Sequence, residues 1–351
     1  MLSKKTYSLT TLAVRFFAFS FVFLVSFEGF SQREKLSKIA GATMGTRYHI
    51  SYFALAKKPS MVKEKVDRRL VAINKAMSTY DPSSEISLFN HRVAPGEWFE
   101  VSSDTRIVLE ESLRLASLTG GALDITIGSL VDLWGFGVDR GVAIPSKASV
   151  HGALARKKGF GLEVSSQGIK KSHAYKIDLS AIAKGFGVDE VARLLRGLSI
   201  ESFMVEIGGE VYAEGHKFDK SPWRIGIQSP GLRGRFARVL ALKGEGMATS
   251  GDYRNYREKG GKRYSHIIDP KTGYPITHRT ASVTVLAKTA MEADGLSTAL
   301  FVMGRKKGLI FANKHGIRAY FLDRKKDGSG FKEYESKPFK AFMAAKAAKA
   351  H

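Results

Sequence analysis

The chain has 351 residues, of which 44% are hydrophobic and 11% aromatic, and this composition excludes a disordered or collagen-like protein. The absence of cysteine excludes a disulfide framework, covalent chemistry on a thiol and a lipid-bearing cysteine. The net charge of +23 would attract polyanions, but the basic residues are scattered without zinc-finger spacing or a basic heptad helix, which argues against a dedicated nucleic-acid module.

Residues 1–31 predict a signal peptide or an N-terminal anchor. Lys4, Lys5 and Arg15 precede the apolar run FFAFSFVFLVSF, which is too short for a comfortable membrane span. Small residues at 29 and 31 allow cleavage before Gln32. The sequence therefore predicts export, with possible membrane association through this segment if it is not removed.

The elements after this segment begin with a strand and two helices. Residues 47–53 alternate polar and apolar side chains after a glycine-rich turn, which predicts a strand. Apolar residues recur at helical spacing over 60–80, a loop is expected over 80–90, and a second helix is expected over 102–121.

The second half of the chain is rich in short strands. Strands are expected at 175–180, 202–215, 223–229, 238–251 and 281–287, and helices at 185–198, 290–304 and 305–316. Strands and helices mixed without strict alternation predict an α+β fold with mixed or antiparallel sheets and packed helices. The main domain is expected over 32–335, and the basic tail 336–351 is expected to be a solvated helix or a disordered end.

The stretch IDLSAIAKGFGVDEV predicts an anion site. Asp178 ends the expected strand, and Lys184 precedes a helix that should begin near Phe186 or Val188. A helix N-terminus beside a lysine favours phosphate. The alternative is a solvated lysine next to glycines that only turn the chain.

Three further groups are candidates. Asp294 and Thr298 lie four apart on one helical face, where a carboxylate and a hydroxyl could hold Mg²⁺, although each could instead serve the helix backbone. His266 precedes the turn DPKTG and could shuttle protons or bind phosphate, although a lone histidine can be purely structural. Met44 and Tyr80 could cover an aromatic ring system or simply pack.

Taken in order, these stretches resemble the ApbE family, the FAD:protein FMN transferases. The resemblance runs from about Gly41 to about Met303 and rests on GATMGT, MSTYDPSSEIS, TGGALDIT, IDLSAIAKGFGVD, IGGEVYAEG, ATSGDY, HIIDPKTGYP and EADGLSTAL. Two departures stand out: family members often carry a lipid-bearing cysteine, and the family's FDP stretch is LDI here. The runs GFGVDRG and GFGVDEV break the GxGxxG spacing, so a Rossmann flavoenzyme is disfavoured.

The resemblance implies a fold with two lobes around a flavin cleft, and a set of site residues. Positions matching the family's FAD contacts are Met44, Tyr80, Ala122, Leu123, Asp124, Asp178, Lys184 and His266. Mg²⁺ would be held by Asp294, Thr298 and the backbone carbonyl of Ala181. Catalysis would rest on His266, Asp294 and Lys184, with Asp269 orienting the histidine or Asp294 acting as the base instead.

The resemblance also implies the reaction and the location. The enzyme would cleave FAD with Mg²⁺, transfer FMN to a Ser or Thr hydroxyl of an acceptor flavoprotein, release AMP, and work in the periplasm or at the periplasmic face of the inner membrane. Two alternatives stay open, which are an FAD pyrophosphatase that gives FMN and AMP and a non-catalytic flavin-binding protein of the cell envelope. A basic module for nucleic acid or lipid is the most distant alternative.

Overall fold

A computed structural model describes residues 35–54, 57–138, 143–157, 161–230, 235–253, 256–259 and 261–348. The predicted signal or anchor, residues 1–31, lies outside these ranges. Within the described ranges, no helix combines the length and apolarity needed to cross a bilayer. The unit that runs from Glu34 to His351 has its own hydrophobic core.

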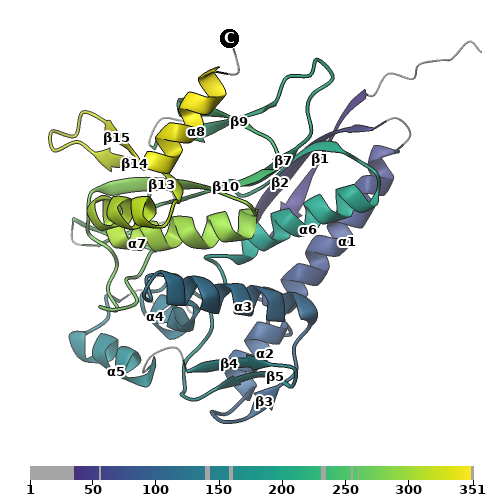
Figure 1. Cartoon of the computed structure of the whole chain (residues 1–351). Helices are drawn as coiled ribbons and strands as arrows, with labels where there is room; N and C mark the ends of the chain where they lie inside the picture. Colours follow the sequence, from purple (N-terminus) through teal and green to yellow (C-terminus); the bar gives the residue numbers. More distant parts are fainter. Residues whose placement is uncertain are drawn as a thin grey trace, which may run out of the picture. The chain divides into compact units, whose positions relative to one another are not determined.

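An eight-stranded sheet organises this unit, and every neighbouring pair of its strands is antiparallel (Figure 1). The order across the sheet is β1-β2-β6-β7-β10-β13-β14-β15. The strands are β1 Lys35–Thr43, β2 Thr46–Ala54, β6 Ser202–Ile207, β7 Glu210–Glu214, β10 Glu245–Gly251, β13 Thr280–Ala287, β14 Arg318–Arg324 and β15 Phe331–Glu335.

Both faces of the sheet are covered. Helices α1 Pro59–Met77, α6 Ala183–Gly197 and α7 Ala290–Lys314 pack on one face and bury the larger core. Helix α8 Lys337–Ala348 and the hairpin of β8 Trp223–Gln228 and β9 Phe236–Leu242 cover the other. Burial from both sides explains why all eight residues of β13 are buried, without the alternation of a half-exposed strand.

The remaining elements lie beyond α6 and α7, on the side away from the sheet (Figure 1). The main core continues into this region through Phe89, Val108 and Ile169, so the parts expected as two lobes belong to one contact unit. Its elements are α2 Glu85–Arg92, α3 Ser103–Leu118, η1 Ile125–Ile127, α4 Gly128–Leu133, α5 Lys147–Lys157, β3 Trp98–Phe99, β4 Leu162–Ser165, β5 Gly168–Lys171, β11 Tyr256–Lys259 and β12 Lys262–Ser265.

Several expectations from the sequence need correction here. The loop expected over 80–90 contains helix α2, because the Ser84 hydroxyl accepts a hydrogen bond from the Ser87 N–H (3.0 Å) and caps it. Residues 175–180 form no strand. Helix α6 begins at Ala183, earlier than expected, which places Lys184 inside its first turn.

The C-terminal tail is also different from its expectation. Helix α8 is packed, since Phe339 is fully buried with its ring 5.5 Å from that of Tyr320. The two helices expected over 290–304 and 305–316 are confirmed as the two helical segments of α7, which meet at the non-helical residue Gly304 (φ 67°, ψ 166°). The chain end therefore contributes to the second core.

Helices α6 and α7 cross in close contact at Gly185. A Cβ atom at this position would lie 2.4 Å from the Ala290 carbonyl oxygen and 2.6 Å from the Met291 Cα. The carboxylates of Asp294 and Asp189 also stabilise the crossing by accepting backbone hydrogen bonds. The Gly185 N–H donates to Asp294 Oδ2 (3.0 Å), and the Asp189 carboxylate accepts from the Ala290 and Met291 N–H groups at the start of α7 (2.9 and 2.8 Å).

The crossing predicts that one added methyl group destabilises the protein at residue 185 but not at the other end of α6. Gly185→Ala should lower the free energy of unfolding by about 1–3 kcal/mol, because the added Cβ meets backbone atoms that cannot move aside. Gly197→Ala, at the other end of α6 with open space around it, should change stability by less than about 1 kcal/mol. Urea unfolding of both variants is the measurement, and equal effects would show that the crossing is not tight.

Candidate functional site

Two buried carboxylates and a partly buried lysine lie where α6, α7 and β7 meet. The Lys184 Nζ is 3.5 Å from Glu210 Oε2 and 3.7 Å from Asp294 Oδ2. Asp294 is 2% exposed and Glu210 is 4% exposed. Burial opposes the charge of Lys184, but the two carboxylates together raise its pKa above the ordinary value. Burial raises the pKa of both acids, and Lys184 offsets part of this increase.

Ala181 lies in the turn before α6, next to the N-cap residue Ile182. The Gly185 N–H belongs to the first turn of α6, whose N–H groups have no acceptor within the helix. It donates to Asp294 Oδ2 (3.0 Å). This hydrogen bond connects the first turn of α6, which begins two residues after Ala181, to the carboxylate of the predicted metal site.

Thr298 lies one turn after Asp294 on α7 and belongs to a chain of hydroxyl groups. Its Oγ1 is 2.9 Å from Ser250 Oγ, which is 2.8 Å from Ser297 Oγ. A carboxylate, a hydroxyl and a carbonyl are hard oxygen donors of the kind that Mg²⁺ binds together with water and phosphate oxygens. Within the described ranges, no group of three or more His, Cys, Asp or Glu side chains could hold a metal ion. The donors present fit Mg²⁺ better than a transition metal.

Glu210 is the residue of this cluster that the sequence analysis did not assign. It begins β7 directly after Gly208 and Gly209, which both have positive φ values (64° and 113°) and form the tight turn from β6. The turn lies against Lys184, because a Cβ at Gly208 would be 3.4 Å from the Lys184 Cδ. A carboxylate directly after a pair of glycines and before the apolar run 211–213 is the sequence signal that could have identified it.

Met44 reaches the same region from the sheet. It has a positive φ of 48° in the turn between β1 and β2, a conformation that costs free energy for a residue other than glycine. Its sulfur would be 3.2 Å from a Cβ at Gly187, so the side chain lies over the first turns of α6. The predicted position at the site is consistent with this placement.

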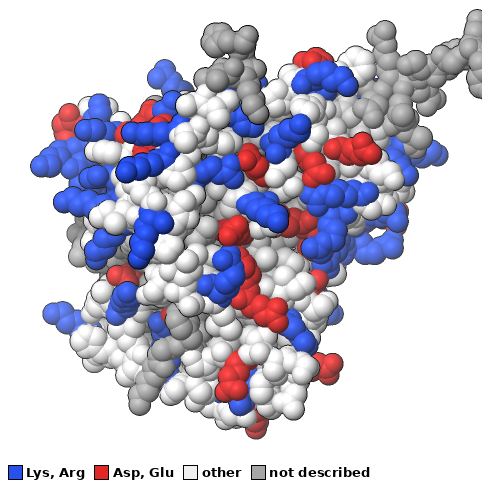
Figure 2. Space-filling model, in the orientation of Figure 1, with Lys and Arg blue, Asp and Glu red and all other residues white. Residues whose placement is uncertain are grey.

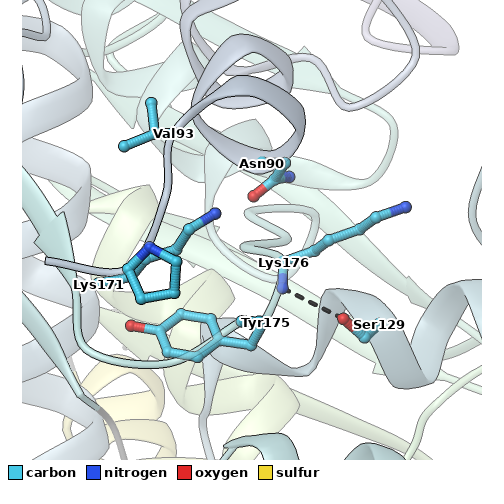
Figure 3. A pocket seen from close by; sticks show the side chains of 8 residues that line it. Asn90, Val93, Ser129, Lys171, Tyr175 and Lys176 are labelled. Atoms are coloured by element: carbon cyan, nitrogen blue, oxygen red, sulfur yellow. Dashed lines mark hydrogen bonds between the residues drawn. The ribbon is translucent and has the colours of Figure 1, made fainter. Parts of the chain in front are cut away.

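Asp178 is held by an extended segment that pairs with no strand. The side chain of Asn90 binds both backbone groups of Ile177, accepting at 2.7 Å and donating at 2.8 Å, and the Lys176 N–H donates to Ser129 Oγ at 3.2 Å (Figure 3). A cavity of about 270 Å³ lies beside these groups. The polar side chains of Asn90 and Ser129 thus replace backbone hydrogen bonds that a neighbouring strand would have supplied.

The Asp178 N–H donates to the carbonyl of Ile125 (2.8 Å), which joins it to the predicted flavin-contacting stretch 122–124. Leu123 is 1% exposed. The Asp124 carboxylate accepts from the N–H and the hydroxyl of Thr126 (2.8 and 2.7 Å) and pairs with Lys157. The side chains of Leu123 and Asp124 are therefore buried and have protein partners in this structure.

His266 and Tyr80 border Phe136. The Tyr80 hydroxyl donates to the Phe136 carbonyl (3.3 Å), and the Phe136 ring lies edge-on to the His266 ring with centroids 6.3 Å apart. Tyr80 is 60% exposed. The carboxylate predicted to orient His266, that of Asp269, accepts from the Lys271 N–H (2.9 Å) and closes its own turn.

Sequence comparisons show which known proteins this chain is similar to. The sequence pattern of the ApbE family matches residues 44–321. The FAD:protein FMN transferase of Vibrio cholerae is 44% identical over 315 residues, which cover 87% of this chain and 92% of that protein. The FAD:protein FMN transferase of Haemophilus influenzae is 42% identical over 326 residues, which cover 89% and 93%.

Solved structures agree with the sequence comparison. The flavin transferase ApbE from Vibrio cholerae has a TM-score of 0.80 at 42% identity, over 88% of this chain and 99% of that one. The apo form of Pseudomonas stutzeri flavinyl transferase ApbE has a TM-score of 0.81 at 38% identity, over 88% and 97%. These similarities confirm the predicted α+β class.

The charge cluster predicts an effect on stability that depends on pH. Lys184→Met should lower the free energy of unfolding at pH 8 by about 3 kcal/mol, because it leaves two buried carboxylates without their cation. Adding Glu210→Gln should recover part of the loss by removing one of these carboxylates.

The sign of the pH dependence comes from the direction of the carboxylate pKa values. Burial raises the pKa values of Asp294 and Glu210, so the folded variant binds more protons than the unfolded chain, and its deficit should shrink as the pH falls from 8 to 5. Urea unfolding at both pH values measures this. Additive losses in the double variant, or a deficit that grows at pH 5, would contradict the coupling.

Proposed function

The chain belongs to the ApbE family and is a transferase, and we propose that it moves the FMN half of FAD onto a Ser or Thr hydroxyl of an acceptor flavoprotein. The bond broken is the one between the phosphorus atom of the FMN half and the bridging oxygen of the FAD pyrophosphate. The bond formed is a phosphoester to the acceptor oxygen, whose proton is lost. AMP leaves with the bridging oxygen.

The observation that carries the proposal is the arrangement around the crossing of α6 and α7. Lys184 supplies a positive charge, Asp294 and Thr298 supply oxygen donors one helical turn apart, and Ala181 lies in the turn before α6. Phosphoryl-type transfer depends mainly on positioning and charge stabilisation, so a nucleophile on the enzyme is unnecessary. The lack of cysteine is compatible with this chemistry.

These donors would hold Mg²⁺, which when bound supplies a Lewis acid for the pyrophosphate oxygens. The chain's own residues account for the other requirements. The Lys184 ammonium attracts the pyrophosphate, and the carboxylates of Glu210 and Asp294 both hold that ammonium in place. Tyr80 and Met44 would cover the ring system of the flavin or the adenine.

His266 is the candidate to accept the proton of the incoming hydroxyl, or to position the phosphate. It comes directly after β12, and Phe136 lies against its ring, so the imidazole is fixed on one side. An imidazole can take up a proton near neutral pH. Asp294 as the base is the competing assignment, and its hydrogen bond from Gly185 and its predicted role as a metal ligand favour His266.

We also propose that the protein is exported through its N-terminal segment and works in the periplasm or at the periplasmic face of the inner membrane. The support is the basic and apolar pattern of residues 1–31. N-terminal sequencing of the protein from a periplasmic fraction, expected to begin at Gln32 if the segment is cleaved, is the direct check.

The reaction is tested by incubating residues 32–351 with FAD, Mg²⁺ and an acceptor flavoprotein, with a chelated control. An acceptor heavier by FMN less water and fluorescent in a denaturing gel, only with metal, supports the proposal. Free FMN and AMP with an unmodified acceptor would identify a pyrophosphatase, and intact FAD would identify a binding protein.

Asp294→Ala should abolish metal-dependent turnover, because it removes the only carboxylate among the proposed metal donors. FAD binding should persist, which fluorescence titration can measure. Glu292→Ala is the matched control on the same helix, since its carboxylate pairs with Arg114 (2.9 Å) outside the site and its loss should leave turnover unchanged. Full activity in the Asp294 variant would refute the metal assignment.

His266→Ala should slow transfer by about 100-fold or more while weakening FAD binding much less, as expected for a proton acceptor. His315→Ala, an exposed histidine at the end of α7, is the control and should alter neither property. Single-turnover rates and FAD titrations separate the two effects. Equal losses in rate and binding would assign His266 to FAD binding instead.

A further inference from the structure

Four lysines surround a groove at one end of the β1–β2 hairpin. Lys35 and Lys38 belong to β1, and Lys57 and Lys58 connect β2 to α1. The groove has a volume of about 530 Å³, and all four side chains are exposed. We call these four residues the lysine groove. Basic side chains are prominent over the right-hand part of Figure 2, where β1, β2 and α1 lie in Figure 1.

The lysine groove carries charge that the described part of the chain does not neutralise. None of its four ammonium groups forms an ion pair with a described residue, whereas Lys63 and Arg68, slightly further along α1, pair with Asp67 and Glu64. The first turn of α1 also lacks an acidic residue. Four uncompensated positive charges around one concave surface favour an anionic partner.

We propose that the lysine groove binds the anionic headgroups of a phospholipid bilayer. The groove lies where the chain enters the fold, since Lys35 begins β1 only eight residues after Phe27, the last residue of the predicted apolar segment. Eight residues span at most about 28 Å. If that segment is in the membrane, even transiently during export, the bilayer surface is the polyanion nearest to the groove.

The residue type also favours a lipid surface. All four cations are lysines, which are compact, strongly hydrated point charges without the planar fork of arginine that grips one phosphate through two hydrogen bonds. Clusters of about four to eight such charges beside an apolar anchor bind anionic bilayers through summed attraction. The groove therefore suits many headgroups at a charged surface rather than a single defined ligand.

Binding there would keep the candidate site accessible. The groove and the turn with Met44 lie at opposite ends of β1, and a strand of nine residues spans about 26 Å between its ends. Contact with lipid at the groove would place the region of Met44 and α6 away from the bilayer, where an acceptor protein could approach. This advantage rests on the proposed function, but the lipid contact itself does not.

The test is co-sedimentation of residues 32–351 with vesicles of phosphatidylcholine alone or mixed with phosphatidylglycerol. This form has its own core and lacks the apolar segment, so insertion cannot mimic surface binding. We expect binding only to the mixed vesicles, and K35S/K38S/K57S/K58S should weaken it by at least about tenfold. K306S/K307S/K325S/K326S removes four exposed lysines elsewhere and should leave binding within about twofold.

Each other outcome would overturn the proposal. Equal losses in the two quadruple variants would show that net charge alone drives binding. Equal binding to both vesicle types would exclude headgroup charge. Heparin binding that depends on the groove, without vesicle binding, would identify a different polyanion. FMN transfer by both variants should match the unsubstituted protein, and because vesicle binding is measured without FAD, failure of the proposed function would not affect this test.

Discussion

The crossing of α6 and α7 is the constraint on which the candidate site depends. Each helix supplies a carboxylate that accepts hydrogen bonds from the first turn of the other: Asp294 from the Gly185 N–H, and Asp189 from the Ala290 and Met291 N–H groups. Close approach is possible because residue 185 has no side chain. The exchange satisfies helix-end donors that would otherwise be buried without partners, and it brings the charged residues of both helices to one place.

Burying charged groups costs free energy, and the arrangement of these groups indicates a role in ligand binding. One ammonium lies between two carboxylates, so the cluster contains more acid than base, and burial raises the pKa values of both acids. A site with two buried carboxylates, one ammonium and nearby hydroxyls suits a hard divalent cation. The lysine at its edge suits the phosphates that such a cation accompanies. Stability alone would favour apolar residues here.

Much of the molecule could be predicted from local pattern. The strand at 47–53 and the helices α1, α3 and α6 are explained by their apolar periodicity, within a few residues at their ends. The segment 175–180 has the alternation of a strand but forms none, because the side chain of Asn90, far away in the sequence, takes the backbone groups of Ile177. The sequence of helix α8 predicts a solvated tail because it is rich in lysine and alanine. Its three large apolar residues, Phe339, Phe342 and Met343, nevertheless pack on the second face of the sheet.

The residue types of the site can be recognised without a structure, since the spacing of Asp294 and Thr298 and the position of Lys184 before two glycines are local features. Their contacts appear only in the packed fold, where Lys184 meets Asp294 and Glu210, and where the Asp124 carboxylate turns inward to Thr126 and Lys157. Helix and strand patterns arise from neighbours a few residues apart. Contacts between α6, α7 and β7 depend instead on which surfaces pack, and on a glycine whose importance appears only when the second helix lies against it.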